Sequence, residues 1–257
     1  MSFVIHERRG SVAIVQLNRP EKFNSLTREM ILALSDLFKE FTQADLRAVI
    51  LTGTGDRAFC AGTDISELNE LNETEALQVS QRGQALCDLI EKCQVPVIAA
   101  INGLAVGGGC ELALACHIRI ASTNARFSLP ETKLGIIPGY GGTQRLPREI
   151  GQARALEAML AGRDLSAAEA LKLGLVNRVT DSTGLMKEAE QLAHDIAKLA
   201  PLAIRACLQA VTRGVELPLE AGLALEAELF ASLFATDDVR EGTNAFLEKR
   251  TPVFKGK

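Results

Sequence analysis

Two glutamates beside glycine-rich segments are the side chains best suited to acid–base chemistry in this sequence. Glu111 lies two residues after a run of three glycines, 107–109, and Glu131 follows Pro130 shortly before a second glycine-rich turn. A carboxyl group whose pKa is raised by burial or by a second carboxyl group can hold a proton at neutral pH, while its ionised neighbour accepts one. The pair therefore indicates general acid and base catalysis.

Each of these features also has a purely structural interpretation. The first N–H groups of a helix that opens from the glycines lack internal partners and lie at its positive end, so they suit a developing negative charge. Glu111 could equally complement that dipole, with the glycines serving only close packing. Glu131 could be a solvated loop carboxylate. In the segment 58–64, Asp64 could be only the N-cap of a helix.

Other well-defined catalytic motifs do not fit this sequence. The segment 53–58 has the spacing of a dinucleotide-binding loop, but no helical pattern begins at its glycines, as that site requires. The sequence contains no Walker-type phosphate loop and no serine in a nucleophile elbow. Its six cysteines form no C-x-x-C pair, and its three histidines are scattered. We therefore expect free, buried thiols and no metal site.

Charge and composition exclude further classes of protein. The 257 residues include 28 basic and 32 acidic side chains, a net charge of −4, which argues against a general nucleic-acid binder. A hydrophobic fraction of 47% is typical of a folded domain. The apolar stretch 95–121 is interrupted by polar residues and glycines, so no run reaches the ~18 residues of a membrane span. With no secretion signal recognisable, the expected location is the cytoplasm.

Strands and helices alternate over the first two thirds of the sequence. Apolar, β-branched runs predict strands at residues 3–5, 12–17, 48–51, 97–101 and 117–121. Apolar residues at a spacing of three to four predict a helix from Thr27 and a second over residues 73–92. Strands linked by helices indicate mostly parallel sheets.

The pattern changes after about residue 182, where strand signals end. Amphipathic periodicity predicts helices over residues 185–199, 202–215, 219–234 and 238–249. We therefore expect an α/β region over residues 1–190 and an all-helical region over residues 191–257. No linker separates them, so both regions should share one compact structure.

The motifs, taken in order, resemble the crotonase (enoyl-CoA hydratase/isomerase) superfamily. The resemblance rests on the segments 18–26, 58–64, 102–116 and 127–143, and it extends to residues 246–250. It therefore covers almost the whole chain. It implies an α/β fold, a crotonase-like spiral of ββα units with a C-terminal all-helical oligomerisation region that forms trimers, commonly paired into hexamers.

The resemblance implies a site that binds an acyl-CoA and stabilises the enolate formed from its thioester. The backbone N–H groups of Thr63 and Gly108 would form the oxyanion hole, where fixed dipoles need no reorganisation during the reaction. Glu111 would activate a water molecule and Glu131 would supply the proton to the α-carbon. Gly139 matches a glycine whose backbone helps to shape this site.

The resemblance also assigns residues that contact the substrate. Beside the pantetheine, the phosphates and the adenine it places Lys22, Phe23, Ser25, Ala61, Asp64 and Ile65. Along the acyl tunnel it places Leu104 and Val106, and among the other substrate- or CoA-binding residues Gly107, Pro130 and Tyr140. Phe246 and Lys249 match positions that reach the CoA of a neighbouring subunit in relatives, and a lysine suits a phosphate as a point charge.

Three residues depart from the pattern of the superfamily. Thr63 replaces the commoner alanine; because the donor is the main chain, its role should survive, although the side chain could narrow the pocket. Tyr140 replaces a frequent alanine, and its phenol could restrict chain length or hydrogen-bond a substituted acyl group. His117 stands where many relatives have aspartate, and we interpret it as structural.

The presence of both glutamates favours a hydro-lyase, a 2-enoyl-CoA hydratase that adds water reversibly and syn to short or medium chains. The alternatives with the same fold are a Δ3-Δ2 enoyl-CoA isomerase and a specialised hydroxyacyl-CoA dehydratase. An alternative of another class is a non-catalytic acyl-CoA or RNA-binding scaffold. We expect no cofactor, because coenzyme A is part of the substrate, and no metal. The expected partners are the acyl-CoA and further copies of the chain, as a trimer or a dimer of trimers, without nucleic acid or membrane.

Overall fold

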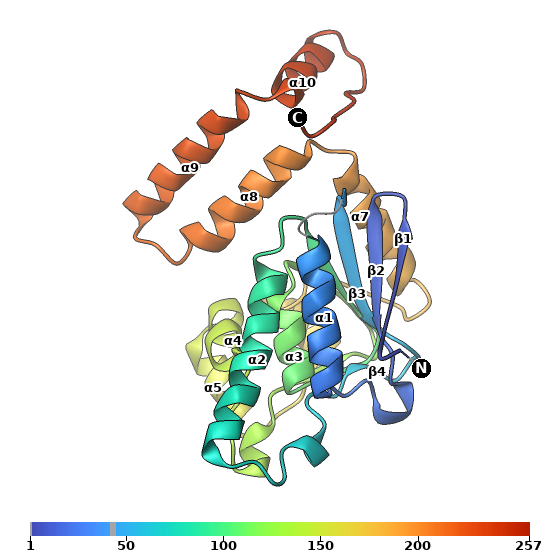
Figure 1. The fold of residues 1–257 in the computed structure, drawn as a ribbon, viewed down its shortest axis with the longest axis vertical. Helices are drawn as coiled ribbons and strands as arrows, with labels where there is room; N and C mark the ends of the chain where they lie inside the picture. The colour runs from blue at the N-terminus through green and yellow to red at the C-terminus, as the bar shows by residue number, and fades with distance from the viewer. Residues whose placement is uncertain (1, 42–44) are drawn as a thin grey trace.

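Two sheets of mostly parallel strands form the body of the protein in the computed structural model, which describes residues 2–41 and 45–257 (Figure 1). The larger sheet has the order β1-β2-β3-β5-β7-β10 and the smaller the order β4-β6-β8-β9. Only the pairs β1–β2 and β8–β9 are antiparallel among the described strands. The strands are β1 Val4–Arg9, β2 Val12–Leu17, β3 Ala48–Gly53, β4 Ala58–Cys60, β5 Val97–Ile101, β6 Leu104–Val106, β7 Ile118–Ser122, β8 Arg126–Ser128, β9 Leu165–Ser166 and β10 Arg178–Thr180.

The helices connect these strands and then continue without them to the C-terminus. The α-helices are α1 Arg28–Phe41, α2 Glu73–Glu91, α3 Gly108–Ala115, α4 Gly142–Ile150, α5 Gln152–Leu160, α6 Ala167–Leu173, α7 Leu185–Ala197, α8 Pro201–Gly214, α9 Leu219–Leu233 and α10 Asp237–Leu247. Short 3-10 turns are η1 Pro20–Lys22, η2 Ile65–Glu67 and η3 Glu131–Leu134. The predicted α/β class and the C-terminal helices are therefore confirmed, and no helix opens from the glycines at 53–58.

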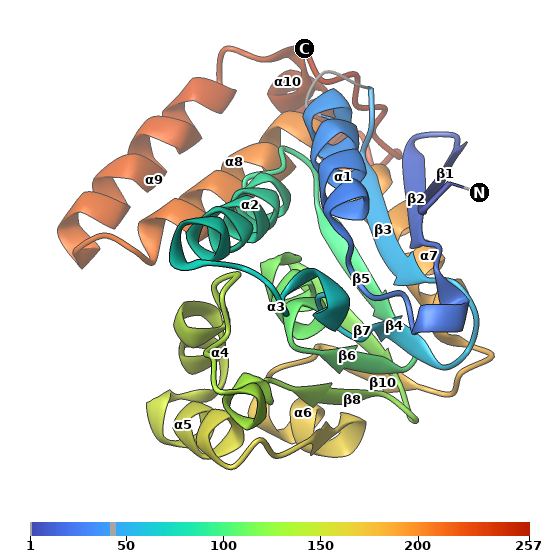
Figure 2. The ribbon, with the colours of Figure 1, turned by 60° about the horizontal axis from the view of Figure 1, so that its bottom comes forward.

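Both faces of the larger sheet are buried at its central strands β2, β3, β5 and β7, which explains their apolar runs. On β2, Val15 and Leu17 belong to the main core beneath α1 and α2, whereas Val12 and Ile14 belong to a second core beneath α7. The same alternation continues on β3 and β5, because successive side chains of a strand point to opposite faces. Figure 2 shows α7 on the opposite side of the sheet from α1 and α2.

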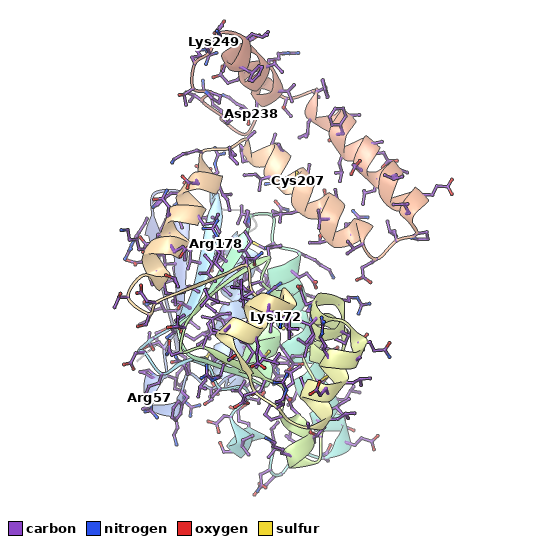
Figure 3. All side chains as sticks on the ribbon, turned by 180° about the vertical axis from the view of Figure 1, so that it is seen from behind. Arg57, Lys172, Arg178, Cys207, Asp238 and Lys249 are labelled. Carbon is purple, nitrogen blue, oxygen red and sulfur yellow. The ribbon has the colours of Figure 1, made fainter. Side chains whose placement is uncertain are left out.

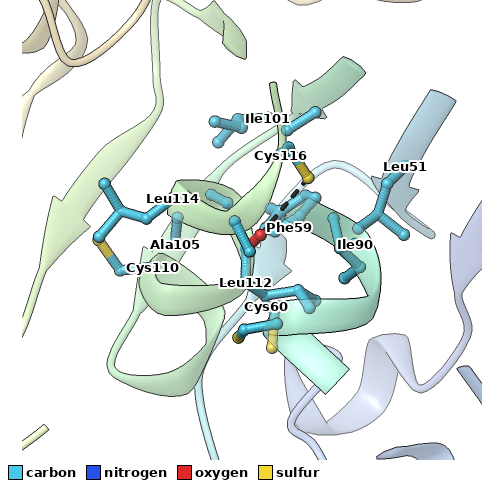
Figure 4. Packing of buried hydrophobic residues seen from close by; sticks show 14 of the residues in the cluster. Leu51, Phe59, Cys60, Ile90, Ile101, Ala105, Cys110, Leu112, Leu114 and Cys116 are labelled. Atoms are coloured by element: carbon cyan, nitrogen blue, oxygen red, sulfur yellow. Dashed lines mark hydrogen bonds between the residues drawn. The ribbon is translucent and has the colours of Figure 1, made fainter. Parts of the chain in front are cut away.

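The helix α3 lies in the centre of the main core, and all of its residues are buried. Figure 4 shows Leu112 of α3 among Cys60 and Ala105 of the smaller sheet and Ile90 of α2; the dashed line is the bond from the Cys116 thiol to the Leu112 carbonyl, 3.4 Å long. Packing on every side fixes where α3 begins. Any group at its first turn is therefore held rigidly.

The helices α8 and α9 pack against each other and extend away from the sheets (Figure 1). The helix α7, by contrast, packs on the larger sheet. It includes residues 190 and 191, between which the boundary of the two regions was predicted, and that boundary stays a prediction. Cys207 on α8 is exposed, and the expectation of six buried thiols was wrong for this one residue, because α8 stands off the body (Figure 3). The five other cysteines are buried and free.

His117 has the structural role expected of it. Its Nδ1 accepts the backbone N–H of Val97 at 2.9 Å, and its Nε2 lies 3.0 Å from the carbonyl oxygen of Glu91. The ring thereby joins the end of α2 to the start of β5. Among the described helices, none is both long and apolar enough to cross a membrane.

Candidate active site

A pocket of about 870 Å³ lies between α2, the start of α3 and the segment around η3. The predicted site residues that line it are Ala61, Thr63, Ile65, Val106, Gly107, Gly108, Glu111, Pro130, Glu131, Gly139 and Tyr140. They come from segments that are up to 79 positions apart in the sequence, Ala61 to Tyr140. The fold thus brings both glutamates and both expected oxyanion residues to one cavity.

Consecutive glycines let α3 begin directly against the smaller sheet. Gly107 has φ 53° and ψ −128°, a conformation that side chains disfavour. At Gly109 a Cβ would lie 2.1 Å from the carbonyl oxygen of Cys60, so no side chain fits there. As the first residue of the helix, Gly108 has an N–H group without a partner inside α3. This N–H is a free donor at the wall of the pocket.

The backbone around Thr63 pairs with Leu26 as in a parallel sheet. The Leu26 N–H donates to the Gly62 carbonyl at 2.7 Å, and the Asp64 N–H donates to the Leu26 carbonyl at 2.9 Å. The N–H of Thr63, between these two, therefore points away from Leu26. Gly108 lies close by, since its N atom would be 3.3 Å from a Cβ on Gly62. In the described part of the chain the Thr63 N–H has no backbone acceptor, so two unpaired donors lie close together.

Two backbone donors hydrogen-bond the buried carboxyl group of Glu111. Only 2% of the residue is exposed, and its Oε1 accepts the N–H groups of Tyr140 at 2.8 Å and Gly142 at 2.7 Å. Burial raises the pKa of Glu111, and these hydrogen bonds act in the opposite direction. Since Oε1 makes both bonds, Oε2 is the oxygen left for a ligand in the pocket that Glu111 lines.

Glu131 is in a different environment. Its Oε2 is buried and has no hydrogen-bond partner among the described residues, and its Oε1 would lie 3.0 Å from a Cβ on Gly107. Burial, reinforced by the charge of Glu111, raises the pKa of Glu131 to about 7. A carboxyl group with a buried oxygen that lacks a hydrogen-bond partner favours its protonated form. The site therefore pairs a carboxyl group that accepts two backbone hydrogen bonds with a second carboxyl group whose pKa lies near neutral pH.

The raised pKa of Glu131 predicts a pH-dependent effect on stability. The folded protein keeps this proton up to about pH 7, whereas the unfolded chain releases it near the ordinary glutamate pKa of about 4.3. Between those values the folded state binds more protons, so stability falls as pH rises. Glu131→Gln removes this loss. We expect its Tm relative to the parent to be higher at about pH 8 than at about pH 5. Thermal unfolding by circular dichroism measures this, and an equal difference at both pH values would contradict the raised pKa.

Several predicted CoA contacts lie beside the pocket and do not line it. The Phe23 carbonyl accepts the N–H of Ala61 at 3.0 Å, and the Phe23 ring lies under the Arg57 guanidinium, 3.8 Å from centroid to Cζ. Lys22 ends η1 just before Phe23. Ser25 accepts a bond from Arg19 at 2.9 Å. These positions adjoin the Thr63 strand, so their contact with CoA stays a prediction.

Asp64 is the N-cap of η2, as its structural interpretation requires. Its carboxylate accepts the N–H and hydroxyl of Ser66, and Arg19 forms an ion pair with it at 2.6 Å. These bonds from Ser66 and Arg19 lower the pKa of Asp64 to about 2. The Asp64 N–H donates to the Leu26 carbonyl, so this residue also fixes the backbone next to Thr63.

The remaining predicted residues are not in this chain's pocket. Leu104 begins β6, two residues before Val106, and is half-buried. Phe246 lies at the end of α10 and is 83% exposed, and Lys249 follows that helix. Figure 3 shows Lys249 at the opposite end of the molecule from Arg57, which covers Phe23. A role of Phe246 and Lys249 in a neighbouring subunit's site is compatible with this position and stays a prediction.

The contribution of α2 to the site was not predicted from the sequence. Ser80 and Gln84, one turn apart on α2, line the pocket and donate to the Gly139 carbonyl at 2.6 and 3.1 Å. The other residues missed are the apolar Leu68, Leu71, Ala76, Val79, Leu134, Ile136 and Ile137, together with Gly62, Pro138, Gly141, Thr143 and Gln144. The available signal was a glycine, Gly83, in the interior of a predicted helix, where glycine is unfavourable without a packing reason.

The chemistry of the pocket agrees with a comparison with known proteins. The enoyl-CoA hydratase/isomerase family model matches residues 7–257. The chain belongs to this family. The predicted superfamily, its fold and an enzyme of the enoyl-CoA hydratase kind are therefore confirmed. No group of three or more His, Cys, Asp or Glu side chains in the described part of the chain is arranged to hold a metal ion.

Relatives of the family match along their full length. The short-chain-enoyl-CoA hydratase of Clostridium acetobutylicum is 43% identical over 96% of this chain and 95% of its own. The 2,3-dehydroadipyl-CoA hydratase of Escherichia coli is 42% identical over all of both chains. The crystal structure of an enoyl-CoA hydratase from Bacillus anthracis superposes with a TM-score of 0.97 at 41% identity, covering all of both chains.

Proposed function

We propose that the protein hydrates short, uncharged 2-enoyl-CoA thioesters to 3-hydroxyacyl-CoA. The observation that carries this proposal is the unequal environment of the two glutamates beside a pair of free backbone donors. Glu111 has two N–H donors on one oxygen, whereas Glu131 has a buried oxygen without a partner. Such a pair suits simultaneous proton removal and proton delivery in one cavity.

In this proposal the thioester carbonyl oxygen lies between the N–H groups of Thr63 and Gly108. Negative charge that develops on that oxygen as water attacks the β-carbon is stabilised by both donors, each worth about 2.7–4 kcal/mol in comparable sites. Glu111 removes a proton from the attacking water. Glu131 delivers its proton to the α-carbon on the same face, so hydrogen and hydroxyl add syn. In the reverse direction, dehydration uses the same two glutamates and backbone donors, so the reaction is reversible.

The acyl group is expected to be uncharged. Among the described residues that line the pocket, no lysine, arginine or histidine occurs, while two glutamates do. A second carboxylate on the substrate would lose its hydration beside acidic groups, with no cation to pair with it. We therefore propose a substrate like crotonyl-CoA in preference to one like 2,3-dehydroadipyl-CoA.

The test is direct assay of the purified protein with crotonyl-CoA and with a 3-enoyl-CoA. Hydration removes the enone absorbance of crotonyl-CoA, and this loss is the expected result. A shifted double bond without hydration would instead identify the isomerase, and binding of butyryl-CoA without either reaction would identify the scaffold. Weaker turnover of 2,3-dehydroadipyl-CoA than of crotonyl-CoA is expected in the same assay.

We also propose that the helical region joins copies of the chain into a trimer or a dimer of trimers. Large apolar side chains are exposed along α8 and α9: Val211, Val215, Leu219, Leu223, Phe230 and Phe234. Apolar surface of this extent is typical of a subunit interface. Light scattering after gel filtration should give three or six times 27.6 kDa, and a monomeric mass would contradict the proposal. A cytoplasmic location stays a prediction.

A further inference from the structure

The two unusual residues Thr63 and Tyr140 contact each other in the structure. The Thr63 hydroxyl donates to the Tyr140 hydroxyl at 2.9 Å, although 77 positions separate them in the sequence. Tyr140 is 5% exposed, so its hydroxyl depends on this bond in the interior. Two of the three departures from the pattern of the family therefore form one unit.

The Tyr140 ring occupies the seam between α2 and α3. A Cβ on Gly83 of α2 would lie 2.0 Å from the ring carbon Cδ1, and a Cβ on Gly108 of α3 would lie 3.0 Å from Cε2 on the opposite edge. Two glycines thus accommodate the ring, one on each helix. With its hydroxyl bonded to Thr63, the ring is held on three sides.

The ring also separates the pocket from the seam. Tyr140 lines the pocket, as do Ser80 and Gln84 on α2, whereas Gly83 between them does not. The ring therefore covers Gly83 and closes the cavity at this point. It does so beside Gly108, whose N–H is proposed to hold the thioester carbonyl, so the wall lies close to the first carbons of the acyl group.

We propose that the Tyr140 ring, seated on Gly83 and bonded to Thr63, is the wall that limits the acyl group of the substrate to short chains. The proposal rests on the proposed function, because the position of the acyl group is inferred from the thioester carbonyl in the proposed oxyanion hole. The hydroxyl of Tyr140 is already bonded to Thr63, so the ring acts by size and not by recognition of a polar substituent. A rigid wall discriminates strongly, since each methylene that fits or fails to fit changes kcat/KM by about 10–200-fold.

The test compares Tyr140→Ala with Tyr140→Phe, which keeps the ring and removes only the hydroxyl. The readout is the ratio of kcat/KM for octenoyl-CoA to that for crotonyl-CoA. We expect Tyr140→Ala to raise this ratio at least ~10-fold and Tyr140→Phe to leave it within ~3-fold of the parent, since the same ring still fills the seam. An unchanged ratio in Tyr140→Ala, or an equal rise in both variants, would overturn the proposal.

A second readout does not depend on turnover. Butyryl-CoA and octanoyl-CoA carry no double bond, so calorimetry measures their binding without reaction. We expect Tyr140→Ala to raise the affinity for octanoyl-CoA relative to butyryl-CoA by ~10-fold; no change in that ratio would again overturn the wall. If the parent hydrates no enoyl-CoA, the proposed function fails, and the binding ratio still decides whether Tyr140 limits chain length.

Discussion

Glu111→Gln and Glu131→Gln are each expected to lower the turnover of crotonyl-CoA by about 10²–10⁴-fold. In Glu111→Gln the amide oxygen can still accept the N–H groups of Tyr140 and Gly142, but the group facing the pocket becomes an NH₂ that cannot remove a proton. In Glu131→Gln the shape of the side chain is kept and its transferable proton is lost. The affinity for butyryl-CoA should change little in either variant, because neither carboxyl group is proposed to bind CoA.

The double variant adds a sharper test of the same assignment. If both groups act on one water molecule in one step, removing the second after the first should cost much less than its effect alone. Glu40→Gln is the matched control, since Glu40 is an exposed glutamate on α1, outside the pocket. Losses under tenfold in both single variants would refute the roles of Glu111 and Glu131, and fully multiplicative losses would show that they act in separate steps.

The main helices and strands were predictable because apolar residues recur along each of them with a clear periodicity. Six apolar residues of α1 recur at a spacing of three to four, and these six are buried: Met30, Ile31, Leu34, Leu37, Phe38 and Phe41. The strands β4 and β8 have three residues each and β9 has two, too few to show an alternation. Their existence depends on pairing with distant segments, which local sequence does not contain.

The two glutamates proposed as catalytic residues were easier to predict from the sequence than the residues that form the walls of the site. Glu111 and Glu131 stand in glycine-rich segments, which mark unusual backbone, and both lie in the pocket. Ser80 and Gln84 carry no such mark, because polar residues on a helix are usually solvated. The contact of Thr63 with Tyr140 also needed the fold, since it joins side chains from two loops.

The protonation states of the two glutamates could be predicted only in outline. The sequence indicated that one carboxyl group would hold a proton, and the resemblance assigned the roles. What distinguishes the two is the peptide segment around Tyr140, whose N–H groups bond Glu111, whereas Oε2 of Glu131 has no hydrogen-bond partner among the described residues. That asymmetry depends on the orientation of the turn around Tyr140. Residue types alone say little about this orientation.

Gly83→Ala is expected to destabilise the parent protein by about 3 kcal/mol. Alanine is ordinarily the better helix residue by about 1 kcal/mol, and Gly83 is in the interior of α2. The added Cβ would, however, lie 2.0 Å from the buried Tyr140 ring, which Thr63 and Gly108 hold on its other sides. Because the ring cannot move away cheaply, the steric cost outweighs the gain in helix propensity.

The sign of this effect should reverse when the ring is absent. In a Tyr140→Ala background the space beside α2 is open, so Gly83→Ala should stabilise by about 1 kcal/mol. Urea unfolding of the four proteins of this cycle measures the coupling between the two positions. Gly214→Ala is the matched control, because a Cβ at Gly214, also in a helix, has nothing within 4 Å. If Gly83→Ala has the same sign in both backgrounds, the ring is not seated on Gly83, and the wall proposed for the acyl pocket loses its support.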